Sequence, residues 1–213
     1  MEELYERQKD LKLTPILSAV IVGLGGVGFW VAQFLAMSGC PEFYLYDFDR
    51  LEETNFNRIA LAPGANRGRS KTEAVEQMIL ALRPECSIWT FGKATEFTLS
   101  QAEGEFFFDC TDRLSTQQQM FAWATANKKK YIRAGYDGTH MTVTDRVAAW
   151  HQGPERTGYE ITPSWVCPAA HAAVMAVEKA MYHPSLDFSG DIKDIEGQIL
   201  RLNSLAKATG VEL

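Results

Sequence analysis

The chain has 213 residues, of which 46% are hydrophobic and 23% charged, a balance typical of one compact α/β domain. Its net charge of −6 and pI of about 5.3 argue against non-specific binding to nucleic acid. No apolar run approaches the roughly 20 residues of a membrane-spanning helix, and the charged start MEELYERQKDLKL fits neither a signal peptide nor a transit peptide. We therefore expect a cytoplasmic protein with a single domain over residues 1–213.

The expected elements alternate between strands and helices. A short amphipathic helix at 1–13 precedes a strand that starts at Ala19, a glycine turn, and a helix that stops at Gly39. The helix at 70–84 has Ser70 as its expected N-cap, Glu73 three residues later as in a capping box, and Pro84 as its stop. Further strands are expected at 42–49, 86–92, 105–112 and 131–136, with a helix at 115–129. This order predicts an α/β fold with a Rossmann-like, mostly parallel sheet and helices on both faces.

The pattern changes after Gly138. Residues 140–151 alternate like an antiparallel strand or hairpin, and 152–165 carry prolines and glycines without periodicity, which predicts a loop. A helix at 168–183 has Pro168 in its first turn, and one more helix is expected over 191–210. We therefore divide the domain into a nucleotide-binding core, 1–138, and a substrate-side part, 139–213, with a small antiparallel and helical content.

A glycine turn joins the first of the alternating strands to its helix. The segment GLGGVG matches G-x-G-x-x-G through Gly23, Gly25 and Gly28. Such glycines let the backbone approach a phosphate, and the helix N-terminus behind them offers free N–H groups. Asp47 follows Gly23 by 24 residues, at the end of the second strand, where an acid binds ribose hydroxyls. The segment predicts an adenine nucleotide but does not separate NAD from ATP.

A polar arm follows Asp47 and does separate the two ligands. It supplies a second acid, two amides and a guanidinium group, and a lysine follows at the next helix: Asp49, Asn55, Asn57, Arg58 and Lys71. A glycine turn satisfies a pyrophosphate largely by itself, whereas a triphosphate needs Arg and Lys donors and a metal. Arg58 offers a fork for a terminal phosphate and Lys71 a point charge. Asp112, at the end of the fourth strand, is a suitable Mg²⁺ ligand.

Four segments together resemble the E1-like activating enzymes of the ThiF/MoeB/HesA type. They are GLGGVG, YDFDRLEETNFNRIA, GRSKTEAVEQMILALRPE and FDCTDR. They match the glycine turn, D-x-D pair, N-x-x-R arm, helix-starting lysine and C-T-D strand end of that family. The resemblance covers residues 5–150 well and the helix at 168–182 weakly. It implies adenylation by ATP and Mg²⁺ of the C-terminal glycine carboxylate of a ubiquitin-like or sulfur-carrier protein, which gives an acyl-adenylate and pyrophosphate.

The same resemblance implies a role for each matched residue. Gly26 would approach the phosphates and Asp47 would hold the ribose. Asn55 and Arg58 would hold the phosphates, with Arg58 near the γ end, while Lys71 would touch the α-phosphate. Asp112 would bind Mg²⁺. The segment YERQ is similar to an R-Q element of the family, by which Arg7 would reach into the nucleotide site of a partner subunit, so that a homodimer is implied.

The sequence also departs from the family. The four cysteines, Cys40, Cys86, Cys110 and Cys167, form no C-x-x-C pair, so we expect no structural zinc. Cys167, at the start of a helix, is a candidate reactive thiolate for a thioester step, or else a small buried apolar residue. His171 follows it by about one helical turn, within reach of that thiol, or else is a core or surface histidine without a catalytic role. The asparagine that follows C-T-D in the family is Arg113 here.

Other functions stay open at this point. The acceptor could be a peptide C-terminus, or a carboxylate on tRNA as in the family's threonylcarbamoyl-adenosine dehydratases, although the acidic charge balance argues against tRNA. An NAD-dependent oxidoreductase would leave Arg58 and Lys71 unexplained. A non-catalytic nucleotide-binding subunit would be expected to lack Arg58, Lys71 or Asp112, and this chain keeps all three.

Overall fold

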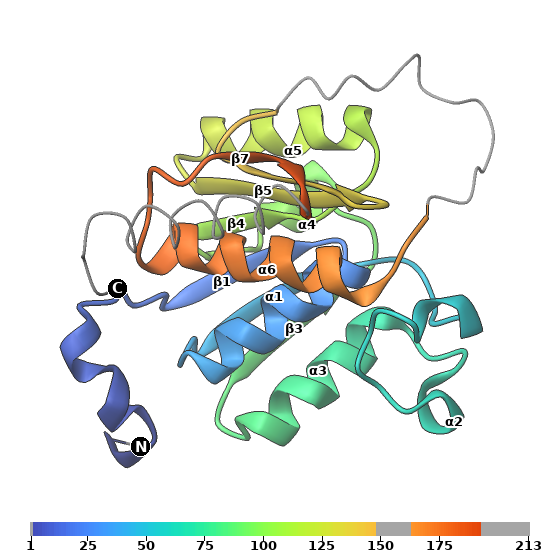
Figure 1. Ribbon diagram of the computed structural model, residues 1–213, viewed down its shortest axis with the longest axis horizontal. Helices are drawn as coiled ribbons and strands as arrows, with labels where there is room; N and C mark the ends of the chain where they lie inside the picture. Colours follow the sequence, from blue (N-terminus) through green and yellow to red (C-terminus); the bar gives the residue numbers. More distant parts are fainter. Residues whose placement is uncertain (1, 148–162, 193–213) are drawn as a thin grey trace, which may run out of the picture.

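The computed structural model describes residues 2–147 and 163–192, which are built around one sheet (Figure 1). The sheet has seven strands in the order β3-β2-β1-β4-β5-β6-β7. Its parallel part consists of β1 (Ser18–Val22), β2 (Glu42–Tyr46), β3 (Ser87–Phe91), β4 (Phe106–Asp109) and β5 (Lys130–Asp137). The strand order reverses between β1 and β4, and in such sheets ligands bind beyond the carboxyl ends of the strands at this point. The predicted Rossmann-like fold is confirmed.

Helices cover both faces of the sheet, as Figure 1 shows. On one face lie α1 (Gly26–Met37), α3 (Lys71–Leu82) and α6 (Val166–Met181), which enclose the larger hydrophobic core with side chains such as Phe29, Ile79 and Ala173. On the other face lie α4 (Glu96–Leu99) and α5 (Leu114–Ala126), over a smaller core that contains Tyr46 and Phe107. More than half of the buried residues of α6 are alanines, which let this helix lie close to α1 and to β5.

The segment after Gly138 extends the same sheet. β5 turns at Gly138, where φ is +59°, and pairs antiparallel with β6 (His140–Thr144), which pairs antiparallel with β7 (Phe188–Asp191). Of the antiparallel strand or hairpin expected over 140–151, the antiparallel strand is therefore present at 140–144, and residues 148–151 lie outside the described residues. The final helix expected from residue 191 is wrong at its start, because Asp191 belongs to β7. The rest of that helix and most of the loop expected over 152–165 lie outside the described residues.

Short helices complete the fold at places where the sequence pattern is weaker. The N-terminal helix is a 3-10 helix, η1 (Glu2–Leu11), and the polar arm holds η2 (Glu53–Asn55) and α2 (Pro63–Asn66). Ser70 is the N-cap of α3, but the capping box predicted for it is wrong. Its hydroxyl pairs with the hydroxyl of Thr72 at 2.7 Å instead of capping the backbone. Within the described ranges, no helix is long and apolar enough to cross a membrane.

Candidate functional site

The glycine turn lies at the reversal point of the sheet, between β1 and α1. Gly23 has a φ of +86°, and a Cβ atom there would lie 2.9 Å from the carbonyl oxygen of Cys110. A Cβ on Gly28 would lie 1.8 Å from the carbonyl oxygen of Gly23, so both glycines are needed for packing. A Cβ on Gly25 would meet no atom within 4 Å. Gly25 thus faces open space beside the free N–H groups of the α1 N-terminus, as a phosphate cradle requires.

Asp47 is fixed against this turn. Its side chain is only 7% exposed, and its Oδ2 accepts a hydrogen bond from the backbone N–H of Leu24 at 2.7 Å. Its Oδ1 accepts from the backbone N–H of Asp49 at 2.8 Å. Burial raises the pKa of Asp47, and the nearby charge of Lys71 opposes that rise. The acid predicted for ribose binding is therefore held rigidly beside the first glycines of the turn.

Lys71, the first residue of α3, joins the two acids. Its Nζ lies 2.8 Å from Oδ2 of Asp49 and 3.9 Å from Oδ2 of Asp47. The lysine side chain is 11% exposed, whereas the side chain of Asp49 is 52% exposed. An ion pair with an exposed carboxylate is weak, so a phosphate group in this space would compete well for the lysine.

Arg58 lies over the start of α1. Its Cδ is 3.0 Å from the position that a Cβ on Gly26 would take. Its Nη1 donates to the carbonyl oxygen of Thr54 at 2.7 Å and to Oδ1 of Asn57 at 2.9 Å. The backbone oxygen of Arg58 accepts a hydrogen bond from the indole N–H of Trp30, at 2.9 Å, so that the arm is tied to α1.

The two amides of the arm have structural contacts of their own. Oδ1 of Asn55 accepts from the backbone N–H of Glu52 at 3.2 Å, which closes the short helix η2. Nδ2 of Asn57 donates to the carbonyl oxygen of Ser164 at 2.8 Å. Asn57 therefore connects the arm to the segment that leads into α6, more than one hundred positions later in the chain.

Asp112 follows β4 on a loop that a buried polar network holds in place. Asp109 is fully buried and accepts from the backbone N–H of Thr111 at 3.0 Å, from its hydroxyl at 2.6 Å and from the hydroxyl of Tyr131 at 2.7 Å. The carbonyl oxygen of Thr111 accepts from Gln117 at 2.9 Å and from Arg133 at 3.2 Å. Burial lowers the pKa of Arg133, and the charge of Asp109 opposes this. The exposed side chain of Asp112 thus starts from a fixed backbone.

The donor set at this edge fits Mg²⁺ only together with a ligand. Among the described residues, no group of three or more His, Cys, Asp or Glu side chains is placed to hold a metal ion. Mg²⁺ is commonly held by one or two carboxylates plus substrate phosphates and water. Asp112 fits that pattern, with the phosphates of a nucleotide as the other ligands. The expectation that structural zinc is missing stays a prediction.

Cys167 lies in the first turn of α6 and is partly exposed. Nδ1 of His171 lies 2.9 Å from the carbonyl oxygen of Cys167, so the contact in this structure is with the backbone and not with the thiol. Cys40 and Cys86 are buried, and burial raises the pKa of Cys40 to about 12. Cys110 is partly exposed as a residue, but burial of its thiol raises the pKa of that thiol as well.

Arg7 lies at the other edge of the sheet. Tyr5 holds the helix η1 in place. Its ring packs against Gly39, which follows the end of α1, and Cζ of Arg83 lies 5.0 Å from the centre of the ring. The 12 residues of α1 separate this point from the glycine turn, a length of about 18 Å. Figure 1 shows the N-terminal segment and the arm with α2 at opposite ends of the sheet. Arg7 therefore does not reach the glycine turn of its own chain.

Several residues at the carboxyl edge, around the glycine turn, were not predicted from the sequence. Tyr136 brings its hydroxyl 3.0 Å from the position of a Cβ on Gly26, and Trp30 anchors the arm. Asp109 and Arg133 form the buried network. The one signal that could have indicated them is polarity inside the apolar strands 105–112 and 131–136, since buried charges need partners.

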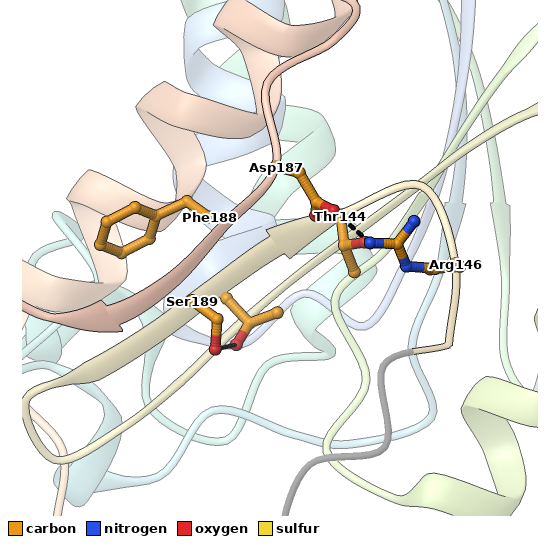
Figure 2. A pocket seen from close by; sticks show the side chains of 6 residues that line it. Thr144, Arg146, Asp187, Phe188 and Ser189 are labelled. Atoms are coloured by element: carbon orange, nitrogen blue, oxygen red, sulfur yellow. Dashed lines mark hydrogen bonds and ion pairs between the residues drawn. The ribbon is translucent and has the colours of Figure 1, made fainter.

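A cavity of about 250 Å³ lies elsewhere, between β6, β7 and the turn before β7. Figure 2 shows Arg146 and Asp187 pointing toward one another, and Nη2 of Arg146 donates to Oδ2 of Asp187 at 2.5 Å. Hydroxyl groups of Thr142 and Ser189 lie 3.3 Å apart in the same wall. β6 runs antiparallel to β5, so this cavity is toward the amino ends of the parallel strands. None of the residues predicted for the nucleotide lines it.

The family model described as the ThiF family matches residues 4–160, which is most of the chain. The chain belongs to the ThiF family. Among curated ThiF relatives, tRNA threonylcarbamoyladenosine dehydratase 2 of Saccharomyces cerevisiae is 31% identical over 137 residues, covering 59% of this chain and 31% of the yeast protein. Molybdopterin-synthase adenylyltransferase of Escherichia coli is 31% identical over 127 residues, covering 58% of this chain and 50% of that protein. The chain thus spans half or less of the length of these relatives.

A solved structure shows a similar fold. The microcin C7 biosynthetic enzyme MccB, in complex with N-formylated MccA, superposes with a TM-score of 0.65 over 83% of this chain and 57% of that chain. The sequence identity is 21%, so this likeness concerns the fold alone. The resemblance inferred from the four sequence segments is confirmed at the level of family and fold.

Proposed function

We propose that this ThiF-family chain uses ATP and Mg²⁺ to adenylate the C-terminal glycine carboxylate of a ubiquitin-like or sulfur-carrier protein. The observation that carries the proposal is the gathering of the glycine turn, Asp47, Lys71, Arg58 and Asp112 at the carboxyl edge of the sheet. Its similarity to an adenylyltransferase supports the reaction class. The proposal includes a cytoplasmic homodimer.

Each residue would bind the part of ATP that lies nearest to it. Asp47, held by the N–H of Leu24, would accept hydrogen bonds from the ribose hydroxyls. The open side of Gly25 and the N-terminus of α1 would take the phosphates. Lys71 would leave Asp49 for the α-phosphate, and Asn55 and Arg58 would hold the phosphates, with Arg58 near the γ end.

The chemistry needs charge neutralisation and alignment. When bound with ATP, Mg²⁺ would offset the negative charge of the phosphates, and Asp112 would hold the ion. The attacking carboxylate is already ionised at neutral pH, so no general base is required. Lys71 and Arg58 would stabilise the charge that develops on the phosphate oxygens. A later step is part of the proposal: the thiolate of Cys167, in the first turn of α6, would attack the acyl carbon of the adenylate, so that a thioester forms and AMP leaves.

A second candidate keeps the adenylation and changes the acceptor. Two curated relatives at 31% and 30% identity are tRNA threonylcarbamoyladenosine dehydratases. The acceptor would then be a carboxylate carried by tRNA. The net charge of −6 makes a large tRNA-binding surface on this chain unfavourable, so we place this reading second.

The test is ATP–pyrophosphate exchange by the full chain with Mg²⁺. The acceptors to compare are ubiquitin-like proteins ending in Gly-Gly, a peptide, and tRNA that carries threonylcarbamoyladenosine. We expect exchange that needs the Gly-Gly tail and that falls about 100-fold or more in Arg58→Ala and Asp112→Ala. Arg67→Ala is the matched control, because Arg67 is an exposed arginine of the same arm, with a side chain 72% exposed.

The outcomes separate the readings. Exchange that survives Cys167→Ala would place any thioester step after the adenylate. Exchange with tRNA alone would favour the second candidate. Tight binding of MgATP without exchange on any acceptor would contradict the proposal and favour a non-catalytic nucleotide-binding subunit. Binding of NADH, seen by its fluorescence, in place of ATP would favour an oxidoreductase.

A further inference from the structure

We propose that Tyr136 is a phosphate-binding residue, whose hydroxyl donates a hydrogen bond to the same terminal phosphates as Arg58. Tyr136 is the residue before the last one of β5 (Lys130–Asp137), at the carboxyl edge of the sheet. The inference rests on the proposed function, because it assumes a triphosphate over the glycine turn.

Three groups from distant parts of the chain meet at Gly26, the first residue of α1. A Cβ atom there would lie 3.0 Å from the Tyr136 hydroxyl oxygen, 3.0 Å from Cδ of Arg58 and 3.2 Å from Cβ of Ala169. The hydroxyl and the arginine stem therefore flank the same point of the turn. The guanidinium at the end of that stem is bonded to Thr54 and Asn57, and a phosphate that took over those bonds would also lie near the hydroxyl.

The hydroxyl of Tyr136 is available for a ligand. Its ring is partly buried against the core that α1 and α6 cover. Among the described residues, this hydroxyl makes no hydrogen bond, in contrast to the Tyr131 hydroxyl, which donates to Asp109 at 2.7 Å. A tyrosine with a packed ring usually finds a partner for its O–H. A phosphate oxygen at the glycine turn would supply that partner, as the strongest acceptor expected there.

The order of the strands assigns the terminal phosphates, and not the nucleoside, to Tyr136. Asp47 follows β2, the glycine turn follows β1, and Tyr136 ends β5, with β4 between β1 and β5. Neighbouring strands are about 4.8 Å apart, so the ends of β2 and β5 are about 14 Å apart. A ribose bound at Asp47 is thus on the far side of the turn from Tyr136. The phosphates that extend away from that ribose run toward β5.

The test compares equilibrium binding of two nucleotides with Mg²⁺ by calorimetry. The non-hydrolysable ATP analogue AMPPNP has the terminal phosphates, and AMP lacks them. We expect Tyr136→Phe to weaken AMPPNP about tenfold or more, as for a lost hydrogen bond to a charged group, and to change AMP by less than about twofold. The matched control is Tyr182→Phe, a tyrosine just past the end of α6 that is 55% exposed.

A purely structural role would give another pattern. Because the hydroxyl has no partner within the described chain, Tyr136→Phe should unfold at the same temperature as the wild type. A clear loss of stability with equal weakening of AMPPNP and AMP would overturn the inference. In an Arg58→Ala background, the effect of Tyr136→Phe on AMPPNP should be smaller than in the wild type, because both residues hold one phosphate.

The two proposals fail in different ways. If the wild-type chain binds AMPPNP no more tightly than AMP, there is no triphosphate site, and the proposed function fails together with this inference. If the wild type prefers AMPPNP and Tyr136→Phe keeps that preference in full, the role of Tyr136 is wrong and the proposed function stands.

Discussion

The three glycines of the G-x-G-x-x-G pattern differ in what surrounds them. Gly25 faces open space at an ordinary φ of −75°, whereas a Cβ on Gly28 would lie 1.8 Å from a backbone oxygen. We expect Gly28→Ala to destabilise the fold by about 3 kcal/mol, through overpacking against backbone. Thermal unfolding should show this as a drop of about 10 °C in Tm.

Gly25→Ala should have the opposite profile. Its methyl group meets no atom of the chain within 4 Å, so Tm should stay within about 2 °C of the wild type. The same methyl would fill space that a phosphate needs, and AMPPNP affinity should fall about tenfold or more. Calorimetry with AMPPNP measures this, and an unchanged affinity would move the phosphates away from Gly25.

The cysteines should differ in reactivity. Burial raises the pKa of Cys40 to about 12, so its thiol stays neutral and inert until the pH approaches that value. Burial also raises the pKa of Cys86 and of Cys110. We expect iodoacetamide at about pH 8 to label Cys167 first, as read by mass spectrometry. Equal labelling of all four cysteines in the folded chain would contradict this, and labelling in urea is the control.

At the scale of elements, the loop between β4 and α5 depends on Asp109. This buried acid accepts both hydrogen bonds of Thr111 and that of Tyr131. Asp109→Ala removes that acceptor and the negative charge beside Arg133, so we expect a loss of about 3 kcal/mol or more in unfolding free energy. Urea denaturation measures it. Asp137→Ala, at an exposed acid that ends β5, should cost almost nothing.

For the whole molecule, the packing of α6 indicates that residues 1–138 and 139–213 do not fold separately. Its alanines are buried against α1 and the sheet, and β6 and β7 complete the same sheet. A fragment of residues 1–138 would expose the core that α6 covers. We expect that fragment not to unfold cooperatively, whereas the full chain unfolds in one transition by circular dichroism. A folded fragment that binds ATP would contradict the single domain that we propose.

The dimer proposal is also tested on the whole molecule. Arg7 lies beyond reach of its own glycine turn, at the far end of α1. If it serves a partner's site in a two-fold dimer, Arg7→Ala and Arg58→Ala should each be inactive in the exchange assay. An equal mixture of the two variants should recover about a quarter of wild-type activity, because half of the dimers then have one complete site. Full activity of Arg7→Ala alone would place Arg7 outside the reaction, and an inactive mixture of two inactive variants would contradict a site shared between subunits.

Much of this site was predicted from local patterns in the sequence. The glycine turn, the acid after β2 and the lysine that starts α3 each follow from a few neighbouring residues, whose backbone conformation their own chemistry favours. The capping box at Ser70 and the helix expected from Asp191 were wrong. At Ser70 the hydroxyl pairs with that of Thr72, two residues away, and not with the backbone. At Asp191 the pairing of β7 with β6 outweighs the local preference for a helix.

The sequence by itself determined the type of strands β1 to β6 and of helices α1, α3, α5 and α6, the ThiF-family motifs, and the acids and cations that suit a triphosphate. The tertiary structure alone decided which of these side chains meet. Tyr136 and Ala169 join Arg58 at Gly26, Asn57 bonds to Ser164, and the contacts of Tyr5 place Arg7 at the far end of α1 from its own turn. Such neighbours are set by strand order and by the packing of α6 on α1, which bring together residues that no local spacing relates.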